Sequence, residues 1–182
     1  MENTKTLRWI EEVFTKSGHM RYSEEVTELE HALQAATFAQ RNDEPDSVVV
    51  ACLLHDFGHL CHDLGEDIAE RGIDARHEEV GAEILAEHFP ASIIEPIRMH
   101  VDAKRYLCGV DSEYLAGLSE ASRQSLMLQG GPMNESEIAE FEANPFFEIA
   151  VRVRKYDDQG KVVDMDTPSL THFLPLIGEF AI

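Results

Sequence analysis

The sequence is poor in cysteine and contains no long apolar run. Its three cysteines, Cys52, Cys61 and Cys108, form no CxxC pair, so we expect free thiols in a reducing compartment. No apolar stretch approaches the roughly 20 residues that a membrane span needs. The first residues also lack the apolar region of a signal peptide. These absences together predict a cytoplasmic protein.

Basic residues are scarce as well. The 182 residues include 15 Lys and Arg against 35 Asp and Glu, which gives a net charge of -20. Nucleic acids and anionic membranes both require a basic surface, so neither is an expected partner. An acidic protein can still take an anionic substrate if a local cationic patch or metal ions receive it.

Apolar residues recur at helical spacing along most of the chain, and no stretch shows convincing strand alternation. The run from Val48 to Leu54 is apolar throughout, which places its helix at the centre of the fold. We predict an all-α, single-domain helical bundle over residues 1–182. The expected helices cover about 4–17, 23–36 (capped by Ser23), 45–60, 76–89, 91–107, 111–117, 119–128, 135–142 and 145–156, with one more after Pro168. Residues 63–75 are expected to form a polar loop.

Histidine and aspartate supply the most informative pattern. Four imidazoles and two carboxylates in one small domain are the donor set of a two-metal site. One Asp can bridge two metals through its two oxygens, whereas an imidazole gives one nitrogen to one metal, so Asp56 is expected between the metals. Any one of these histidines could instead satisfy a backbone carbonyl in the core. The candidate ligands are His31, His55, Asp56, His77, His100 and Asp157.

The segment Leu53-Leu54-His55-Asp56-Phe57-Gly58-His59 resembles the HD-domain superfamily of metal-dependent phosphohydrolases and oxygenases. Further segments resemble the HD-domain mixed-valent diiron oxygenases that degrade phosphonates. They begin at Leu29-Glu30-His31, His100-Val101-Asp102-Ala103-Lys104, Gln129-Gly130-Gly131-Pro132-Met133 and Arg154-Lys155-Tyr156-Asp157.

The resemblance implies two iron ions in an Fe(II)/Fe(III) state, with O2 as co-substrate. His31, His55, Asp56 and Asp157 would hold one iron, and His77, His100 and Asp56 the other. The implied reaction cleaves the C–P bond of a small organophosphonate, a 1-hydroxy-2-(amino or trimethylamino)ethylphosphonate. The products would be phosphate and glycine or glycine betaine.

Six further residues are candidates for substrate contact. Lys104 and Arg154 lie one helical turn from His100 and Asp157, so each pair shares a helix face, although both cations could equally form surface ion pairs. His59, four residues after His55, could donate to a substrate oxygen or interact with a helix C-terminus. The resemblance adds Ser122 and Gln129 as phosphonate ligands, and Glu24 as a receiver of the amine.

The family carries a Tyr ten residues before the first His of its motif, where this chain has Arg21, with Tyr22 displaced by one. The role of this position is therefore open. Two other functions also remain open from the residues alone. One is an HD phosphohydrolase that acts on a nucleotide or phosphate ester. The other is a helical interaction module without catalysis.

Overall fold

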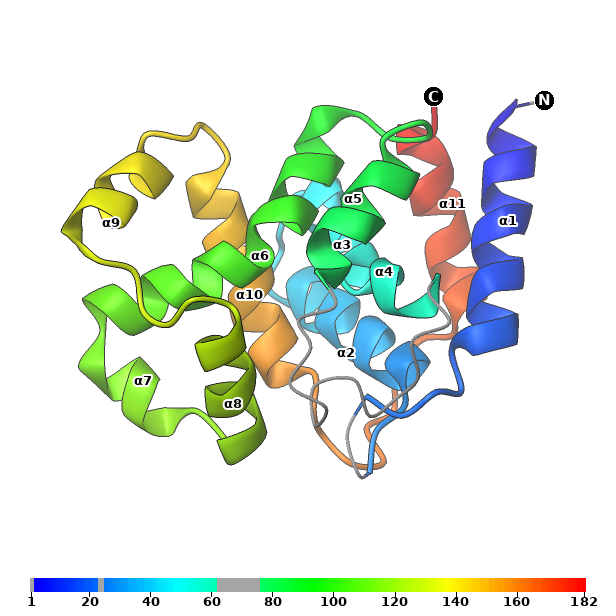
Figure 1. The fold of residues 1–182 in the computed structure, drawn as a ribbon. Helices are drawn as coiled ribbons and strands as arrows, with labels where there is room; N and C mark the ends of the chain where they lie inside the picture. Colours follow the sequence, from blue (N-terminus) through cyan, green and yellow to red (C-terminus); the bar gives the residue numbers. More distant parts are fainter. Residues whose placement is uncertain (1, 23–24, 62–75) are drawn as a thin grey trace.

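In the computed structural model, residues 2–22, 25–61 and 76–182 are described, and they form α-helices without a strand beyond one isolated bridge between Arg21 and Thr27. The predicted all-α class is confirmed (Figure 1). The helices are α1 (Glu2–Ser17), α2 (Glu28–Arg41), α3 (Asp46–Leu54), α4 (Phe57–Leu60), α5 (His77–Leu85), α6 (Ala91–Val110), α7 (Ser112–Gly117), α8 (Glu120–Leu128), α9 (Glu135–Glu142), α10 (Phe147–Gln159) and α11 (Leu170–Phe180).

Helix α3 lies at the centre, as its composition predicts. Every residue from Val48 to Leu54 is at most 1% exposed. The helix packs against α2, α6, α10 and α11. A helix that is apolar on all sides must be covered on all sides, and these four neighbours provide that cover.

The prediction of one continuous helix from 45 to 60 is wrong, because the helix is interrupted at the predicted ligands His55 and Asp56. Helix α3 ends at Leu54, and Asp56 has φ -99° and ψ 13°, which interrupts the helix before α4 begins at Phe57. On a continuous helix the side chains of His55 and Asp56 would diverge by about 100°. The break lets both reach the same space.

Close packing of two glycines explains the break. A Cβ on Gly58 would overlap the carbonyl oxygen of His77, and a Cβ on Gly81 would lie 3.0 Å from the Gly58 nitrogen. Helix α4 therefore rests directly on the backbone of α5, which a straight continuation of α3 would not allow. The contact fixes His77 relative to Asp56.

Helix α2 also differs from expectation, because it begins at Glu28 and not near Ser23. The Thr27 side chain accepts from the Glu30 N–H, and the Glu30 carboxylate accepts from the Thr27 N–H at 2.8 Å. This reciprocal capping box fixes the start of the helix. Ser23 and the whole of the predicted loop at 63–75 lie outside the described residues.

The remaining boundaries shift by a few residues. Helix α5 ends at Leu85, four residues before its predicted end, and α6 runs on to Val110. Helix α10 extends to Gln159, so Asp157 lies inside the helix. Residues 161–163 form no strand.

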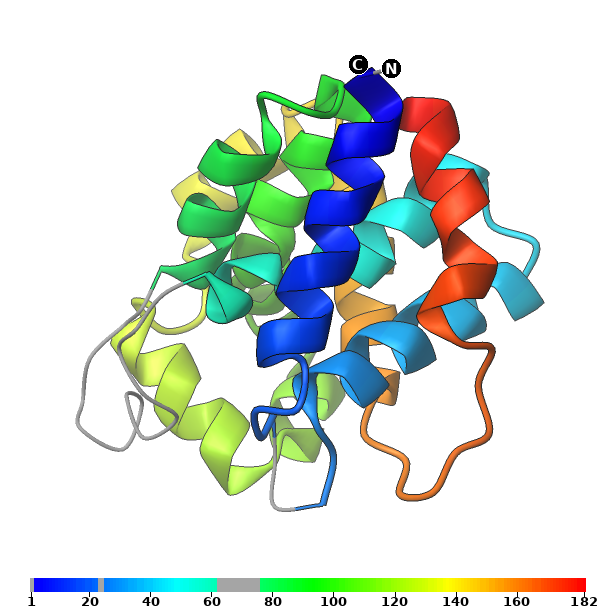
Figure 2. The same cartoon turned by 90° about the vertical axis from the view of Figure 1, so that its right-hand side faces the viewer.

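Two groups of helices flank the centre. Helices α1 and α11 pack side by side against the main core, and both chain ends lie at the same end of the molecule (Figures 1 and 2). Helices α7, α8 and α9 stand on the side of α6 and α10 (Figure 1), and α9 packs against these two helices through a smaller apolar cluster that includes Met133 and Phe141. No helix among the described residues is both long and apolar enough to cross a membrane.

We expect Gly58→Ala to disturb the contact between α4 and α5. The added methyl meets backbone that cannot rotate away, so the free energy of unfolding should fall by about 1–3 kcal/mol or more, with some loss of metal content. Thermal unfolding and metal analysis check this. Gly117→Ala is the control, because a Cβ there meets nothing within 4 Å, and its effect should stay below about 1 kcal/mol. Equal effects of the two substitutions would contradict the packing argument.

Candidate metal centre

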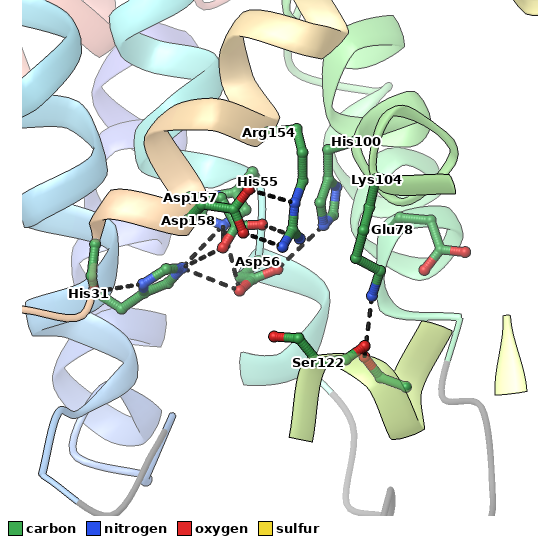
Figure 3. A network of polar contacts seen from close by, with 12 residues as sticks. His31, His55, Asp56, Glu78, His100, Lys104, Ser122, Arg154, Asp157 and Asp158 are labelled. Atoms are coloured by element: carbon green, nitrogen blue, oxygen red, sulfur yellow. Dashed lines mark hydrogen bonds and ion pairs between the residues drawn. The ribbon is translucent and has the colours of Figure 1, made fainter. Parts of the chain in front are cut away.

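The six predicted ligands converge on one buried site from five places in the fold, and Figure 3 labels all of them except His77. Each is at most 9% exposed. Helix α2 contributes one imidazole, the junction of α3 and α4 contributes the His-Asp pair, and α5, α6 and α10 contribute one residue each. These residues are His31, His55, Asp56, His77, His100 and Asp157.

The first set of donor atoms surrounds one oxygen of Asp56. The Nε2 atoms of His31 and His55 lie 3.0 Å apart. Asp56 Oδ2 is 3.4 Å from the first and 3.3 Å from the second. Asp157 Oδ1 completes the set at 3.4 Å and 3.8 Å from the same two nitrogens.

The second set surrounds the other oxygen of Asp56. The Nε2 atoms of His77 and His100 lie 3.1 Å apart. Asp56 Oδ1 is 3.2 Å from His77 Nε2 and 3.5 Å from His100 Nε2. One carboxylate therefore faces both sets, with one oxygen for each.

Backbone carbonyls fix which nitrogen of three rings carries the proton. Nδ1 of His31, His55 and His100 donates to the carbonyl oxygens of Gly160, Cys52 and Ile97 at 2.7, 2.8 and 2.7 Å. A carbonyl oxygen can only accept, so the Nε2 atoms of the neutral rings present lone pairs. For the fourth ring, Nδ1 of His77 lies 3.6 Å from Glu78 Oε2.

This arrangement fits metal ions. Two imidazole lone pairs 3.0 Å apart repel each other unless a cation lies between them. A metal bound at about 2.0–2.2 Å separates neighbouring ligand atoms by roughly 3.0–3.5 Å, which matches the observed spacings. Imidazole and carboxylate suit iron, manganese, zinc and similar divalent metals.

The charges of the carboxylates and imidazoles are strongly coupled. Burial alone would lower the pKa of His31 and His55, but Asp157 and Asp56 outweigh it and raise both pKa values. Asp56 likewise raises the pKa of His77. The pKa of His100 instead falls to about 4, because burial dominates.

His59 lies beside the second set. Its ring stacks on that of His77, with centroids 4.0 Å apart and planes at 17°. His59, Asp56 and His77 offer ligand atoms within 4.8 Å of one another. Because α3 and α4 are separate helices, His59 faces His77 and not the side of α3 that carries His55.

Lys104, one of the predicted phosphonate contacts, is only 4% exposed. Its Nζ donates to Ser125 Oγ at 3.0 Å, so the hydroxyl that accepts from the ammonium is that of Ser125 and not that of Ser122. Ser122 Oγ instead pairs with Ser119 Oγ at 3.0 Å. Gln129 ends α8, and its Oε1 is buried without a hydrogen-bond partner in the described part of the chain.

Arg154 is held in a dense network. Its Nη1 donates to Asp157 Oδ2 at 2.5 Å, and its Nη2 pairs with Asp158 Oδ1. Its Nε approaches the Tyr114 hydroxyl at 3.1 Å, and that hydroxyl donates to Asp158 at 2.6 Å. The guanidinium thus orients Asp157, a predicted metal ligand. The carboxylates of Asp157 and Asp158 largely neutralise its positive charge.

Tyr22 also belongs to the site. Its hydroxyl donates to Asp157 Oδ1 at 3.1 Å, and its ring stacks on His31 with centroids 3.6 Å apart. Arg21 is exposed. Tyr22, although displaced by one position, therefore contacts two predicted metal ligands, His31 and Asp157. Glu24, the predicted receiver of the amine, lies outside the described residues.

Sequence reasoning missed three contributors. Gly160 supplies the carbonyl that orients His31, and a Cβ there would lie 2.7 Å from His31 Nδ1. Ser125 contacts Lys104, and Glu28 is buried near the imidazoles. The position of Glu28 one turn before His31 is a signal that could have identified it.

Comparison with known proteins matches this chain to one family model and to several curated proteins. The model described as the HD domain matches residues 23–126. A [1-hydroxy-2-(trimethylamino)ethyl]phosphonate dioxygenase (glycine-betaine-forming) of Leisingera caerulea is 46% identical over 91% of this chain and 85% of its own length. A hydroxymethylphosphonate dioxygenase of Gimesia maris is 46% identical over 89% of this chain and 81% of its own. An uncharacterised protein of Acanthamoeba polyphaga mimivirus is 35% identical over 99% of this chain and 82% of its own.

We expect Asp56→Ala to remove both metals, because one carboxylate faces both donor sets. His100→Ala touches one set only and should leave about one metal per chain, against about two in the unaltered protein. Elemental analysis after anaerobic loading with Fe(II) and desalting measures this. Asp102→Ala, which removes an exposed carboxylate paired with Arg105, should retain full loading. Two metals in Asp56→Ala would rule out the shared carboxylate.

Metal binding should release protons and strengthen as pH rises. Neighbouring carboxylates raise the pKa values of His31, His55 and His77, so metal competes with protons on these rings. Affinity should increase by up to about tenfold per pH unit for each proton released. Calorimetric titration with Mn²⁺ in buffers of different ionisation enthalpy counts those protons. Affinity that is unchanged between pH 6 and pH 8 would contradict the coupling.

Proposed function

Because this chain belongs to the HD-domain family, and to the part of it that contains two phosphonate dioxygenases, we propose that it is a diiron oxygenase that cleaves a C–P bond. The proposed substrate is a 1-hydroxy-2-(amino or trimethylamino)ethylphosphonate. The products are phosphate and a carboxylic acid, glycine or glycine betaine. The observation that carries the proposal is the 46% identity to both dioxygenases over about nine-tenths of the chain.

The overall reaction balances without any other reactant. The carbon that bears the hydroxyl loses its C–H and C–P bonds and becomes a carboxyl carbon, while both atoms of O2 enter the two products. Four electrons pass from the substrate to O2, so no external reductant is needed. Hydrolysis alone does not provide this route, because a C–P bond offers no good leaving group.

We assign the six converging residues as ligands of the two metals. His31, His55, Asp157 and one oxygen of Asp56 would hold one ion. His77, His100 and the other oxygen of Asp56 would hold the second. A pair of iron ions in the Fe(II)/Fe(III) state would supply redox activation of O2 and the Lewis acidity that lowers the pKa of the substrate hydroxyl.

The cations of the site are assigned to the phosphonate. Lys104 is buried beside Arg154, and burial followed by the Arg154 charge lowers the pKa of Lys104 to about 8. An arriving phosphonate dianion would restore the preference for the charged amine. The Lys104 ammonium has three N–H donors and gives one to Ser125, which leaves donors for the phosphonate. Hydrogen bonds from Lys104 to the phosphonate would hold the reacting carbon in a fixed position at the site.

Polar groups around the cations complete the proposed substrate contacts. The buried Oε1 of Gln129 lacks a hydrogen-bond partner among the described residues, and the substrate hydroxyl could supply one. Ser122 lies on α8 close to Lys104 (Figure 3). His59, stacked on His77, can donate from its ring to a substrate oxygen. Glu24 remains a candidate for the amine. We assign Lys104 and His59 as the groups that assist the reaction directly.

The proposal is tested by oxygen consumption. Anaerobically iron-loaded protein is given 2-amino-1-hydroxyethylphosphonate, its N-trimethylated form or hydroxymethylphosphonate, and O2 is then admitted. We expect equal amounts of O2 consumed and phosphate released, and no phosphate without O2. Lys104→Met should raise KM by about 10- to 100-fold through loss of a charge-assisted contact. Phosphate release from nucleotides or phosphate esters under anaerobic conditions would indicate a phosphohydrolase instead.

A further inference from the structure

Tyr114 brings a hydroxyl to the Arg154 guanidinium from outside α10. The hydroxyl donates to Asp158 Oδ2 at 2.6 Å and accepts from Arg154 Nε at 3.1 Å. Asp158 Oδ2 also lies 3.3 Å from the same Nε. Burial raises the pKa of Tyr114, so its hydroxyl stays protonated and remains a donor to the carboxylate. The three groups therefore form a closed set of hydrogen bonds.

The other hydrogen-bond partners of Arg154 in the described part of the chain come from its own helix. Its Nη1 donates to Asp157 Oδ2 and its Nη2 pairs with Asp158 Oδ1 (Figure 3). Both carboxylates lie on α10, so they set the position of the guanidinium relative to that helix alone. Lys104, the other cation of the site, lies on α6. A partner from outside α10 is needed to fix Arg154 relative to Lys104, and Tyr114 is that partner.

Helix α7 ties Tyr114 to the helix that carries Lys104. It follows α6 directly, with Asp111 as its N-cap. The Asp111 carboxylate accepts from the N–H groups of Glu113 and Tyr114 at 2.9 and 3.1 Å, and such a cap stabilises the first turn of a helix. Helices α6 and α7 also pack against each other. The position of Arg154 is thereby linked to α6 through Tyr114.

Arg154 retains donors for a ligand. A guanidinium has five N–H groups, and its partners among the described residues engage one N–H on each of the three nitrogens. One N–H therefore remains on each terminal nitrogen, in the planar fork that suits two oxygens of one anion. Arg154 is 5% exposed and is the strongest electrostatic neighbour of Lys104. A phosphonate that contacts both cations requires them at a fixed separation.

On the basis of the proposed function, we propose that Tyr114 is a positioning residue, which holds the Arg154 guanidinium beside Lys104 so that both cations receive the phosphonate. Tyr114 touches neither the substrate nor a metal. Its hydroxyl acts only through Arg154 and the Asp158 carboxylate that pairs with it. Loss of the hydroxyl should therefore weaken phosphonate binding and leave the metal content unchanged.

A double-mutant cycle tests this dependence. Mn²⁺-loaded protein is titrated calorimetrically with hydroxymethylphosphonate in the absence of O2. Tyr114→Phe should weaken binding by about 5- to 10-fold, the effect of one hydrogen bond, and Arg154→Met by about 10- to 100-fold. With Arg154→Met already present, Tyr114→Phe should weaken binding by less than about twofold further. Tyr106→Phe removes a similar donation, to Glu142 at 2.8 Å between α6 and α9. It is the matched control and should bind as the unaltered protein does.

Two further measurements separate positioning from general damage. Elemental analysis should find two metals per chain in every variant of the cycle. In turnover, Tyr114→Phe should raise KM for hydroxymethylphosphonate by about 5- to 10-fold and keep kcat within about twofold. If Arg154→Met loses metal, Arg154→Lys replaces it in the cycle, because an ammonium lacks the planar fork that Tyr114 and Asp158 hold.

Unchanged affinity in Tyr114→Phe, or the same fold-loss with and without Arg154, would overturn the role of Tyr114 while leaving the oxygenase intact. Unchanged affinity in Arg154→Met would overturn it too, because Tyr114 would then position no phosphonate ligand. Failure of the oxygenase itself appears as no turnover of any of the three hydroxyphosphonates. The same cycle titrated with inorganic phosphate then decides about Tyr114, because phosphate needs the same two cations. A loss of phosphate affinity that depends on Arg154 would support the role, and equal binding or no binding would refute it.

Discussion

The carboxylate of Asp56 is the group on which the whole site depends, because its two oxygens face two separate pairs of imidazoles. Each pair has its Nε2 atoms about 3 Å apart, 3.0 Å for His31 and His55 and 3.1 Å for His77 and His100. Such close lone pairs need positive charge between them. Asp56 adds the negative charge that makes two cations tolerable so near each other, and burial from solvent strengthens every one of these interactions.

The fold is built to hold that carboxylate still. A break between α3 and α4 brings His55 and Asp56 into one space, and the contact of Gly58 with the backbone of α5 sets the distance to His77. Backbone carbonyl oxygens, among them that of Gly160, accept hydrogen bonds from the Nδ1 atoms of the imidazole rings. These supports come from backbone atoms, which move less than side chains. These contacts orient the imidazole nitrogens toward the two donor sets.

The sequence predicted the helical class and the central place of α3, because apolar periodicity and a seven-residue buried run are properties of local sequence. It also predicted the six residues that converge, since their types and order are typical of one family. It did not predict the break at Asp56 or the contact of Ser125 with Lys104. Both depend on which backbones touch across the fold, as at Gly58 and His77. Glu28 escaped notice because acidic residues are common here, and only burial distinguishes it from a solvated carboxylate.

The most direct test of the shared carboxylate is anomalous diffraction at the iron edge from crystals loaded anaerobically with Fe(II). The account predicts two peaks about 3.5–4 Å apart, with the two oxygens of Asp56 each about 2.0–2.2 Å from a different peak. A single peak, or two peaks of which one lies beyond bonding distance of Asp56, would contradict it.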